Sequence, residues 1–408
     1  FMASASEHFA TTFQAWAAAR PANDFQAVRP LLEKSLELSR RFAEYFPGHD
    51  HVADPLIALE DYGLAVATLR PLLAALRERL VPLVQAVVAQ PPADASCLRL
   101  YYPADTQWAL SLEVLERMGY DFQRGRQDIA PHPFTTGFSV GDVRITNRVR
   151  EHDLAEVFFG ALHEGGHALY EQGIAREFEG LPLGEGASAG VHESQSRLWE
   201  NLVGRSRPFW EHFYPQLVAA FPAQLGHVPP DTFYRAINRV SRSLIRTDAD
   251  EVTYNLHVML RFDFELDLLE GRLAVRDLPE AWRARMQADL GLAPPHDRDG
   301  ALQDVHWFAG PVGGQFQGYA LGNVLSAQFF AAAVRARPAI PGEMACGEFG
   351  TLHDWLRENV YAHGAKYTPA ELVERVTGAP MGIEPYMAYL EGKYGPLYGL
   401  EPGEVGRG

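Results

Sequence analysis

Cysteine is scarce in this chain of 408 residues, which contains only Cys97 and Cys346. The two lie far apart in the sequence and form no C-x-x-C pair. A disulfide framework needs more cysteines, and a thiolate zinc site needs cysteines at close spacing. The sequence therefore argues against both, and any metal site has to use histidine and carboxylate ligands.

Long apolar runs and blocks of basic residues are also missing. No run of about 18 apolar residues is present, so no membrane-spanning helix is predicted. The 36 Lys and Arg are outnumbered by 52 Asp and Glu, and the formal net charge of -16 makes nucleic acid and anionic membranes unfavourable partners. The first residues lack a basic segment followed by an apolar core, so no secretory signal is predicted and a cytoplasmic location is expected.

Most of the sequence has the periodicity of amphipathic helices, with apolar residues three and four positions apart. The segment 134–146 instead alternates and is rich in β-branched and aromatic residues, which predicts a hairpin with its turn at 139–142. The expected fold is mainly α with one small β-sheet. Helices are expected at 7–19, 24–46, 64–88, 107–118, 153–173, from about 188, and at 231–244, 250–269, 279–290, 319–334, 352–360, 368–377 and 383–394.

The segment 161–170 contains the sequence His163-Glu164-Gly165-Gly166-His167 within an apolar helical run. Positions i and i+4 share one face of a helix, so His163 and His167 can bind one Zn²⁺ while Glu164 reaches a metal-bound water. Burying these polar groups without partners would cost several kcal/mol, which favours a metal site over two chance histidines. Gly165 and Gly166 each weaken a helix by roughly 1 kcal/mol, so we expect another backbone or the substrate to approach them closely.

A catalytic zinc of this kind needs a third protein ligand, and five glutamates downstream are candidates. Glu171 lies on the same helix and would have difficulty curling back onto the ion. Glu177, Glu179 and Glu185 fall in an expected loop. Glu193, near the start of the next helix, is the best choice because a helical position holds its carboxylate rigidly.

Six short motifs occur along the chain in a fixed order. Together they make the sequence resemble the M32 family of metallocarboxypeptidases, the carboxypeptidase Taq group. The resemblance runs from the early helices to the carboxyl end. The motifs are His132-Pro133-Phe134, Asp142-Val143-Arg144-Ile145-Thr146, His163-Glu164-Gly165-Gly166-His167, His192-Glu193-Ser194, Ile245-Arg246-Thr247-Asp248-Ala249-Asp250 and Gly300-x-x-Gln303-Asp304-x-His306-Trp307.

The resemblance implies an all-α, saddle-like peptidase with a deep groove, similar in architecture to neurolysin and angiotensin-converting enzyme, and a homodimer. It implies a single peptidase catalytic domain over residues 1–408, with an amino-terminal segment shorter than is usual for the family. It further implies one Zn²⁺ per chain, for which Co²⁺ can substitute. The expected partners are peptide substrates with a free C-terminus.

A carboxypeptidase has to bind the terminal carboxylate of its substrate, and a buried guanidinium suits that planar anion. Arg246 matches the carboxylate-binding arginine of the family. The alternative is a structural ion pair between Arg246 and Asp248 or Asp250.

The expected mechanism is hydrolysis at a single zinc ion. Glu164 takes a proton from the zinc-polarised water and passes it to the leaving amine. His306 and Tyr319 are candidate donors to the carbonyl oxygen; alternatively they are a core histidine bonded to Asp304 and a packing tyrosine. Four further residues are assigned to substrate binding, with hairpin shaping as the alternative for the first three: His132, Arg144, Thr146 and Gln303.

We therefore expect a zinc carboxypeptidase of broad specificity that releases single amino acids from peptide C-termini. One alternative is a dipeptidyl carboxypeptidase or oligopeptidase on the same scaffold. The other is a zinc-stabilised scaffold protein without catalysis.

Overall fold

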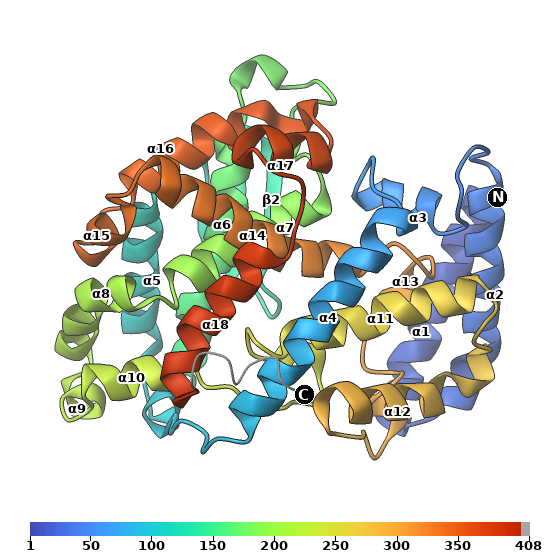
Figure 1. The fold of residues 1–408 in the computed structure, drawn as a ribbon, viewed down its shortest axis with the longest axis horizontal. Coiled ribbons are helices and arrows are strands. Elements are labelled where there is room, and N and C mark those ends of the chain that lie inside the picture. The colour runs from blue at the N-terminus through green and yellow to red at the C-terminus, as the bar shows by residue number, and fades with distance from the viewer. Residues whose placement is uncertain (401–408) are drawn as a thin grey trace. The chain divides into compact units, whose positions relative to one another are not determined.

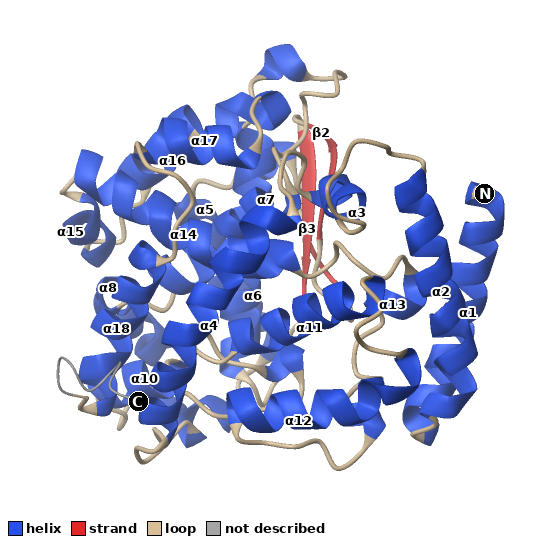
Figure 2. Ribbon diagram, turned by 45° about the vertical axis from the view of Figure 1, so that its right-hand side comes forward, coloured by secondary structure: helices blue, strands red, loops and turns tan. Residues whose placement is uncertain are grey.

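The computed structural model describes residues 1–400 and consists mainly of α-helices (Figures 1 and 2). The chain forms two compact units. Among residues 1–400, unit 1 comprises Phe1–Gln90, Val240–Ala320 and residues 394–400, and unit 2 comprises Pro91–Arg239 and Leu321–Lys393. The expected class, mainly α with one small sheet, is confirmed.

Unit 1 is built from helices that bury one apolar face each. In α2 the side chains of Val28, Leu32 and Leu36 are buried at helical spacing, and the Asp24 carboxylate caps the helix by accepting the backbone N–H of Ala27. The helices of this unit are α1 (Met2–Ala22), α2 (Phe25–Glu44), α3 (Asp54–Glu60), α4 (Val66–Val88), α11 (Tyr254–Leu269), α12 (Leu278–Leu290), α13 (His306–Ala309) and the start of α14 (Gln317–Ala336).

In unit 2, α6 packs against α5, α7 and the small sheet, and it is buried along most of its length. No helix among residues 1–400 combines the length and apolar character needed to cross a membrane. The helices of this unit are α5 (Ala104–Met118), α6 (Leu154–Gly173), α7 (Ala189–Arg197), α8 (Arg207–Ala220), α9 (Pro222–Leu225), α10 (Pro230–Ile237), α15 (Ile340–Ala345), α16 (Gly350–Asn359), α17 (Pro369–Thr377) and most of α18 (Glu384–Tyr398).

The sheet lies in unit 2 and has the strand order β1-β3-β2 (Figure 2). β2 (Thr135–Ser139) and β3 (Asp142–Asn147) form the expected antiparallel hairpin. β1 (Gln127–Ile129) pairs with β3 in parallel and was not predicted, because three residues are too few to show a period. β3 packs against α6 through the face that carries Val143 and Ile145.

The bounds predicted for α6 are confirmed to within one residue, since the helix runs from Leu154 to Gly173. Asp153 occupies the N-cap position, where a carboxylate is expected to cap the helix, but its carboxylate contacts Arg99 and caps no backbone N–H. Gly173 is the last residue of the helix, yet it has no positive φ, and Ile174 after it is extended. Gly173 is instead a point of close approach, since a β-carbon there would lie 2.6 Å from the Cβ of Tyr361.

Helices expected at 231–244 and 250–269 are shorter than predicted. α10 ends at Ile237 and α11 begins at Tyr254. The carboxylate of Asp250 accepts the backbone N–H groups of Ser241, Val252 and Thr253, and these bonds hold the intervening chain in a non-helical course. Five helices were not predicted, namely α3, α8, α9, α13 and α15. All of them except α13 have a proline at the start, which weakens the periodic signal.

The prediction that another backbone approaches the paired glycines closely is confirmed for Gly166, whereas Gly165 is approached by side chains. A β-carbon on Gly165 would lie 2.6 Å from the Cδ2 of Leu115 on α5. A β-carbon on Gly166 would lie 2.5 Å from the carbonyl oxygen of Gln195 and 2.8 Å from the Cα of Ser196, both on α7. Gly166 therefore allows the backbones of α6 and α7 to come together.

Replacing Gly166 with alanine is expected to destabilise the chain, because the backbone of α7 cannot move aside as a flexible side chain could. The free energy of unfolding should fall by about 1–3 kcal/mol, measured by urea denaturation. Gly392→Ala is the matched control, since Gly392 lies inside α18 with nothing within 4 Å of a β-carbon. That variant should gain up to about 1 kcal/mol. Equal changes in the two variants would contradict the close approach at Gly166.

Candidate active site

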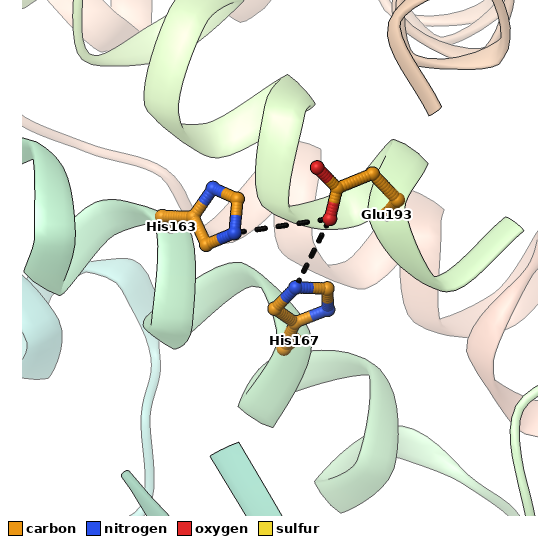
Figure 3. Close-up of side chains that lie close together, drawn as sticks. All are labelled: His163, His167 and Glu193. Atoms are coloured by element: carbon orange, nitrogen blue, oxygen red, sulfur yellow. Dashed lines mark ion pairs between the residues drawn. The ribbon is translucent and has the colours of Figure 1, made fainter. Parts of the chain in front are cut away.

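Two adjacent helices of unit 2 bring the three predicted metal ligands together. His163 and His167 lie one turn apart on α6, and Glu193 lies on α7, which begins where the Ser188 hydroxyl accepts the backbone N–H of Val191. One ligating atom from each of the three lies within 4.8 Å of the others. Figure 3 shows both imidazoles pointing toward the carboxylate, whose Oε2 is 3.8 Å from His163 Nε2 and 3.3 Å from His167 Nε2.

Glu193 is held from two further directions. Its Oε1 accepts a hydrogen bond from Arg197 Nε at 2.7 Å, and its Oε2 accepts one from Ser196 Oγ at 3.0 Å. Burial opposes ionisation of the Glu193 carboxyl group. The positive charge of Arg197 and the interactions with His163 and His167 outweigh this effect, so the pKa of Glu193 lies well below the usual range. Gly322 on α14 packs directly on the Glu193 side chain, where any β-carbon would clash.

The outer nitrogen of His163 binds a second carboxylate. Nδ1 donates to Glu200 Oε2 at 3.0 Å, and Glu200 also pairs with Arg197 and Arg205. Although burial penalises its charge, the hydrogen bond from His163 and the nearby arginines lower the pKa of Glu200 to about 2. Glu200 lies in a π-helical turn, Leu198–Val203, that continues α7, an irregularity often found at functional sites.

The outer nitrogen of His167 has a different partner. Its Nδ1 lies 2.6 Å from Nδ1 of His192, and Nε2 of His192 lies 2.6 Å from Oε1 of Glu171. Each of the two histidines on α6 therefore has one nitrogen directed at Glu193 and the other engaged by a fixed polar group.

Glu164 lies on the same helix between the two histidines and is buried, with 7% of its surface exposed. The hydroxyl of Thr135, at the start of β2, lies 2.7 Å from Glu164 Oε2 and 3.1 Å from the Glu164 carbonyl oxygen. The small sheet thus fixes the carboxylate next to the histidine pair.

The donor set fits a divalent metal ion. Two imidazoles and one carboxylate are the ligand types of a catalytic zinc site that keeps one position open. The outer nitrogens of both imidazoles are already bonded, which leaves the inner ones for a metal. His163, His167 and Glu193 are therefore the residues that would hold the ion.

The predicted carboxylate anchor, Arg246, lies in unit 1 in the short 3-10 turn Arg246–Asp248 and is buried. Its ion pair is with Asp304, at 2.9 Å from Nη2, and neither Asp248 nor Asp250 takes that place. Nε also binds Asp304, and Nη1 donates to Tyr254 Oη at 3.0 Å. Asp304 pairs with Arg261 as well, so two buried arginines share one carboxylate.

His306 and Tyr319 are neighbours in unit 1, with His306 Nε2 3.2 Å from Tyr319 Oη. The Nδ1 of His306 is 3.9 Å from Asp304, too far for the hydrogen bond considered as an alternative. Burial lowers the pKa of His306 to about 4. The charge of Asp304 opposes this shift, and the charges of Arg246 and Arg261 add to it. The imidazole is therefore neutral at pH 7.

Gln303 is buried in unit 1 and has its side-chain amide bound to backbone groups. Its Oε1 accepts the N–H of Arg246 at 2.9 Å, and its Nε2 donates to the carbonyl oxygens of Leu244 and Asp299. These contacts fix the backbone at Arg246.

The three predicted residues of the hairpin region lie at its surface in unit 2. His132 is exposed and bonds only locally, to the carbonyl oxygen of Pro133. Arg144 is also exposed, pairs with Asp142 at 2.6 Å and lies over the ring of Phe138. The Thr146 hydroxyl is 2.9 Å from the N–H of Phe134, a contact that fixes the start of the hairpin.

Several residues around the predicted ligands were not singled out from the sequence. Thr135 and Glu200 contact Glu164 and His163, but they lie 29 and 37 positions away, beyond the range of any periodic pattern. Arg261 lies on α11 among apolar residues. A charged residue in such an apolar helical run was the sequence signal that could have indicated a buried ion pair. Glu171 was considered only as a ligand and instead contacts His192.

Comparisons with known proteins agree with the motifs. The family model described as carboxypeptidase Taq (M32) metallopeptidase matches residues 1–394. Thermostable carboxypeptidase 1 of Thermus thermophilus is 44% identical over 394 residues, which cover 94% of this chain and 77% of the relative. Carboxypeptidase 1 of Bacillus subtilis is 39% identical over 385 residues, 94% of this chain and 77% of the relative.

A solved structure gives the same result for the fold. The crystal structure of the M32 carboxypeptidase from Deinococcus radiodurans has a TM-score of 0.96 at 53% identity, covering 98% of this chain and 80% of that chain. The expected resemblance is thus confirmed, and the alternative of a scaffold without catalysis loses its basis. The chain belongs to the carboxypeptidase Taq (M32) family of metallopeptidases and is a metallocarboxypeptidase.

Proposed function

We propose that this chain is a zinc carboxypeptidase that removes single residues from the free C-termini of peptides, with broad specificity. The observation that carries the proposal is the convergence of His163, His167 and Glu193 within 4.8 Å beside the buried Glu164. We further propose that both units serve one catalytic domain. The roles proposed below for residues of unit 1 are argued only from contacts within that unit.

We propose His163, His167 and Glu193 as the ligands of one zinc ion, for which Co²⁺ can substitute. Two nitrogen ligands and one carboxylate suit zinc and cobalt better than magnesium or calcium, which prefer oxygen. When bound, the ion polarises the scissile carbonyl and makes water acidic enough to react at neutral pH.

Glu164 is proposed as the general base. Its carboxylate takes the proton of the attacking water and delivers it to the amine that leaves. Two observations support this role: Glu164 is buried next to the two histidines, and the Thr135 hydroxyl donates a hydrogen bond to its Oε2. Because Oε2 accepts this hydrogen bond, Oε1 is the oxygen that receives the proton.

His306 and Tyr319 are proposed as donors to the carbonyl oxygen on which negative charge develops. Their mutual contact and the neutrality of His306 support this role, because a neutral pair can donate without adding a second full charge. For Gln303 we propose a supporting role through Arg246, since its amide is bound to backbone groups. His132, Arg144 and Thr146 are proposed to align the substrate or to shape the hairpin.

Arg246 is proposed to bind the terminal carboxylate of the peptide. Its bonds to Asp304 and Tyr254 use Nε–H, one Nη2–H and one Nη1–H, so that three of its five N–H donors have acceptors within residues 1–400. The remaining two can form the paired bonds that suit a carboxylate. Two arginines against one Asp304 also leave an excess positive charge for an anion.

A homodimer is proposed from the sequence resemblance, and the cytoplasmic location expected in the sequence analysis remains a proposal. Light scattering tests the first, and a monomer mass at micromolar concentration would contradict it.

The proposed reaction is tested with a peptide ladder. A peptide of distinct residues is incubated with the protein, with and without a chelator, and followed by mass spectrometry. We expect successive losses of single C-terminal residues that stop in the chelator and return on adding Zn²⁺. Losses of two residues at a time or internal cuts would favour the dipeptidyl carboxypeptidase or oligopeptidase alternative. Unchanged cleavage in the chelator would contradict a metal enzyme.

Thr135→Val tests how Glu164 is held. Losing one hydrogen bond to a charged group should lower kcat about tenfold. Metal content should stay the same, and Thr135→Ser should keep most of the activity. Thr136→Val is the matched control on the same strand. Glu164→Gln is the reference for complete loss of the base, and it should abolish hydrolysis while still binding the metal. If Thr135→Val turns over like the parent, the threonine does not position the base.

Arg246→Ala tests the anchor. Losing a paired, charge-assisted contact should lower kcat/KM for peptides with a free C-terminus about 100-fold, and leave the slow cleavage of amidated peptides nearly unchanged. Arg272→Ala, an exposed arginine of the same unit, should affect neither substrate. Thermal unfolding of the variant controls for damage to the buried ion pairs. Equal losses on both peptides would count against a carboxylate anchor.

A further inference from the structure

We propose that Glu171 and His192 form a positioning pair that fixes the tautomer and orientation of His167, and so sets how tightly the metal is held. The inference rests on the proposed role of His167 as a ligand. It assigns a function to two residues that contact neither the metal nor the substrate in the proposed mechanism.

The three side chains form one continuous hydrogen-bonded row. His167 Nδ1 lies 2.6 Å from His192 Nδ1, and His192 Nε2 lies 2.6 Å from Glu171 Oε1. His167 and Glu171 are four positions apart on α6, so they share the face that also carries His163. His192 comes from α7 and precedes Glu193 in the chain. The row therefore joins the two helices that supply all three proposed ligands.

The order of donors along this row follows from its two ends. A metal at His167 needs the lone pair of Nε2, so the ring proton of neutral His167 has to sit on Nδ1. His192 Nδ1 then accepts a hydrogen bond from His167 Nδ1–H, and the ring proton of His192 sits on Nε2. An ionised Glu171 accepts hydrogen bonds but cannot donate them. With this placement of the protons, each contact in the row therefore has one donor and one acceptor. With a donor at Glu171 the row could run in the opposite direction, and His167 would present N–H to the metal.

The ring of His192 is fixed in place by its surroundings. A β-carbon on Gly186 would lie 2.7 Å from His192 Cδ2, so the loop backbone closely covers one edge of the ring. The ring of Tyr170 lies 5.1 Å from it, between ring centroids, and the Tyr170 hydroxyl accepts the N–H of Ala187 at 2.9 Å. His192 therefore acts as a rigid spacer between His167 and the carboxylate.

The two proposed histidine ligands thus differ in their support. His163 donates directly to the carboxylate of Glu200, whereas His167 reaches a carboxylate only through a second imidazole. Partners of this kind change metal affinity about 10- to 100-fold when they are removed. If Glu171 acts through His192, its effect has to vanish once His192 is gone.

The experiment measures the Zn²⁺ dissociation constant by competition with a chromophoric chelator, together with the absorption spectrum of the Co²⁺ form. Glu171→Gln should weaken Zn²⁺ binding about tenfold, and His192→Phe about 10- to 100-fold. His192→Asn, which offers an oxygen acceptor near the position of Nδ1, should recover most of the affinity. The double variant Glu171→Gln/His192→Phe should bind no more weakly than His192→Phe alone. The Co²⁺ spectra of Glu171→Gln and His192→Phe should both change.

The controls separate this inference from the proposed metal centre. Glu177→Gln removes the same charge from an exposed position nearby and should bind like the parent. Thermal unfolding of the metal-free variants shows whether the fold is intact. If Glu193→Ala binds Zn²⁺ as tightly as the parent, the proposed centre itself is wrong. If Glu193→Ala loses the metal while Glu171→Gln and His192→Phe match the parent, or their effects add in the double variant, the positioning pair is refuted.

Discussion

The close approach of α6 and α7 at Gly166 is the constraint on which the rest of the proposed metal centre depends. A side chain at this position would meet the backbone of Gln195 and Ser196, so the distance between the helices is set by a missing β-carbon. That distance brings Glu193 within reach of His163 and His167. It also allows His192, the neighbour of Glu193, to contact His167. A single packing requirement thus determines several polar contacts at once.

Charge balance is the second principle in this structure. Glu193 and Glu200 are carboxylates that share Arg197, and Arg205 adds a second cation on Glu200. These two carboxylates and two arginines balance, whereas in unit 1 two arginines share Asp304 and leave a positive excess. The carboxylate of the proposed peptide substrate would complete that balance.

The sequence was most informative where chemistry depends on short spacing. His163, Glu164 and His167 follow from a helical period, and Glu193 follows from rigidity at the start of the next helix. The sequence could not supply contacts between distant segments, such as Thr135 on Glu164 or Arg261 on Asp304. The prediction from the sequence also made α10 too long. The carboxylate of Asp250 binds the backbone N–H of Ser241, nine positions away, and the periodicity of apolar residues does not reveal such a contact.

The paired glycines of α6 also bear on the order in which this molecule assembles. Gly165 and Gly166 lie within α6 between the two histidines, so local propensity alone gives this turn little stability. Its helical form depends on the docking of α5 and α7. The turn that carries the ligands is therefore completed only when its neighbours arrive, and a peptide spanning α6 alone would not preserve the site.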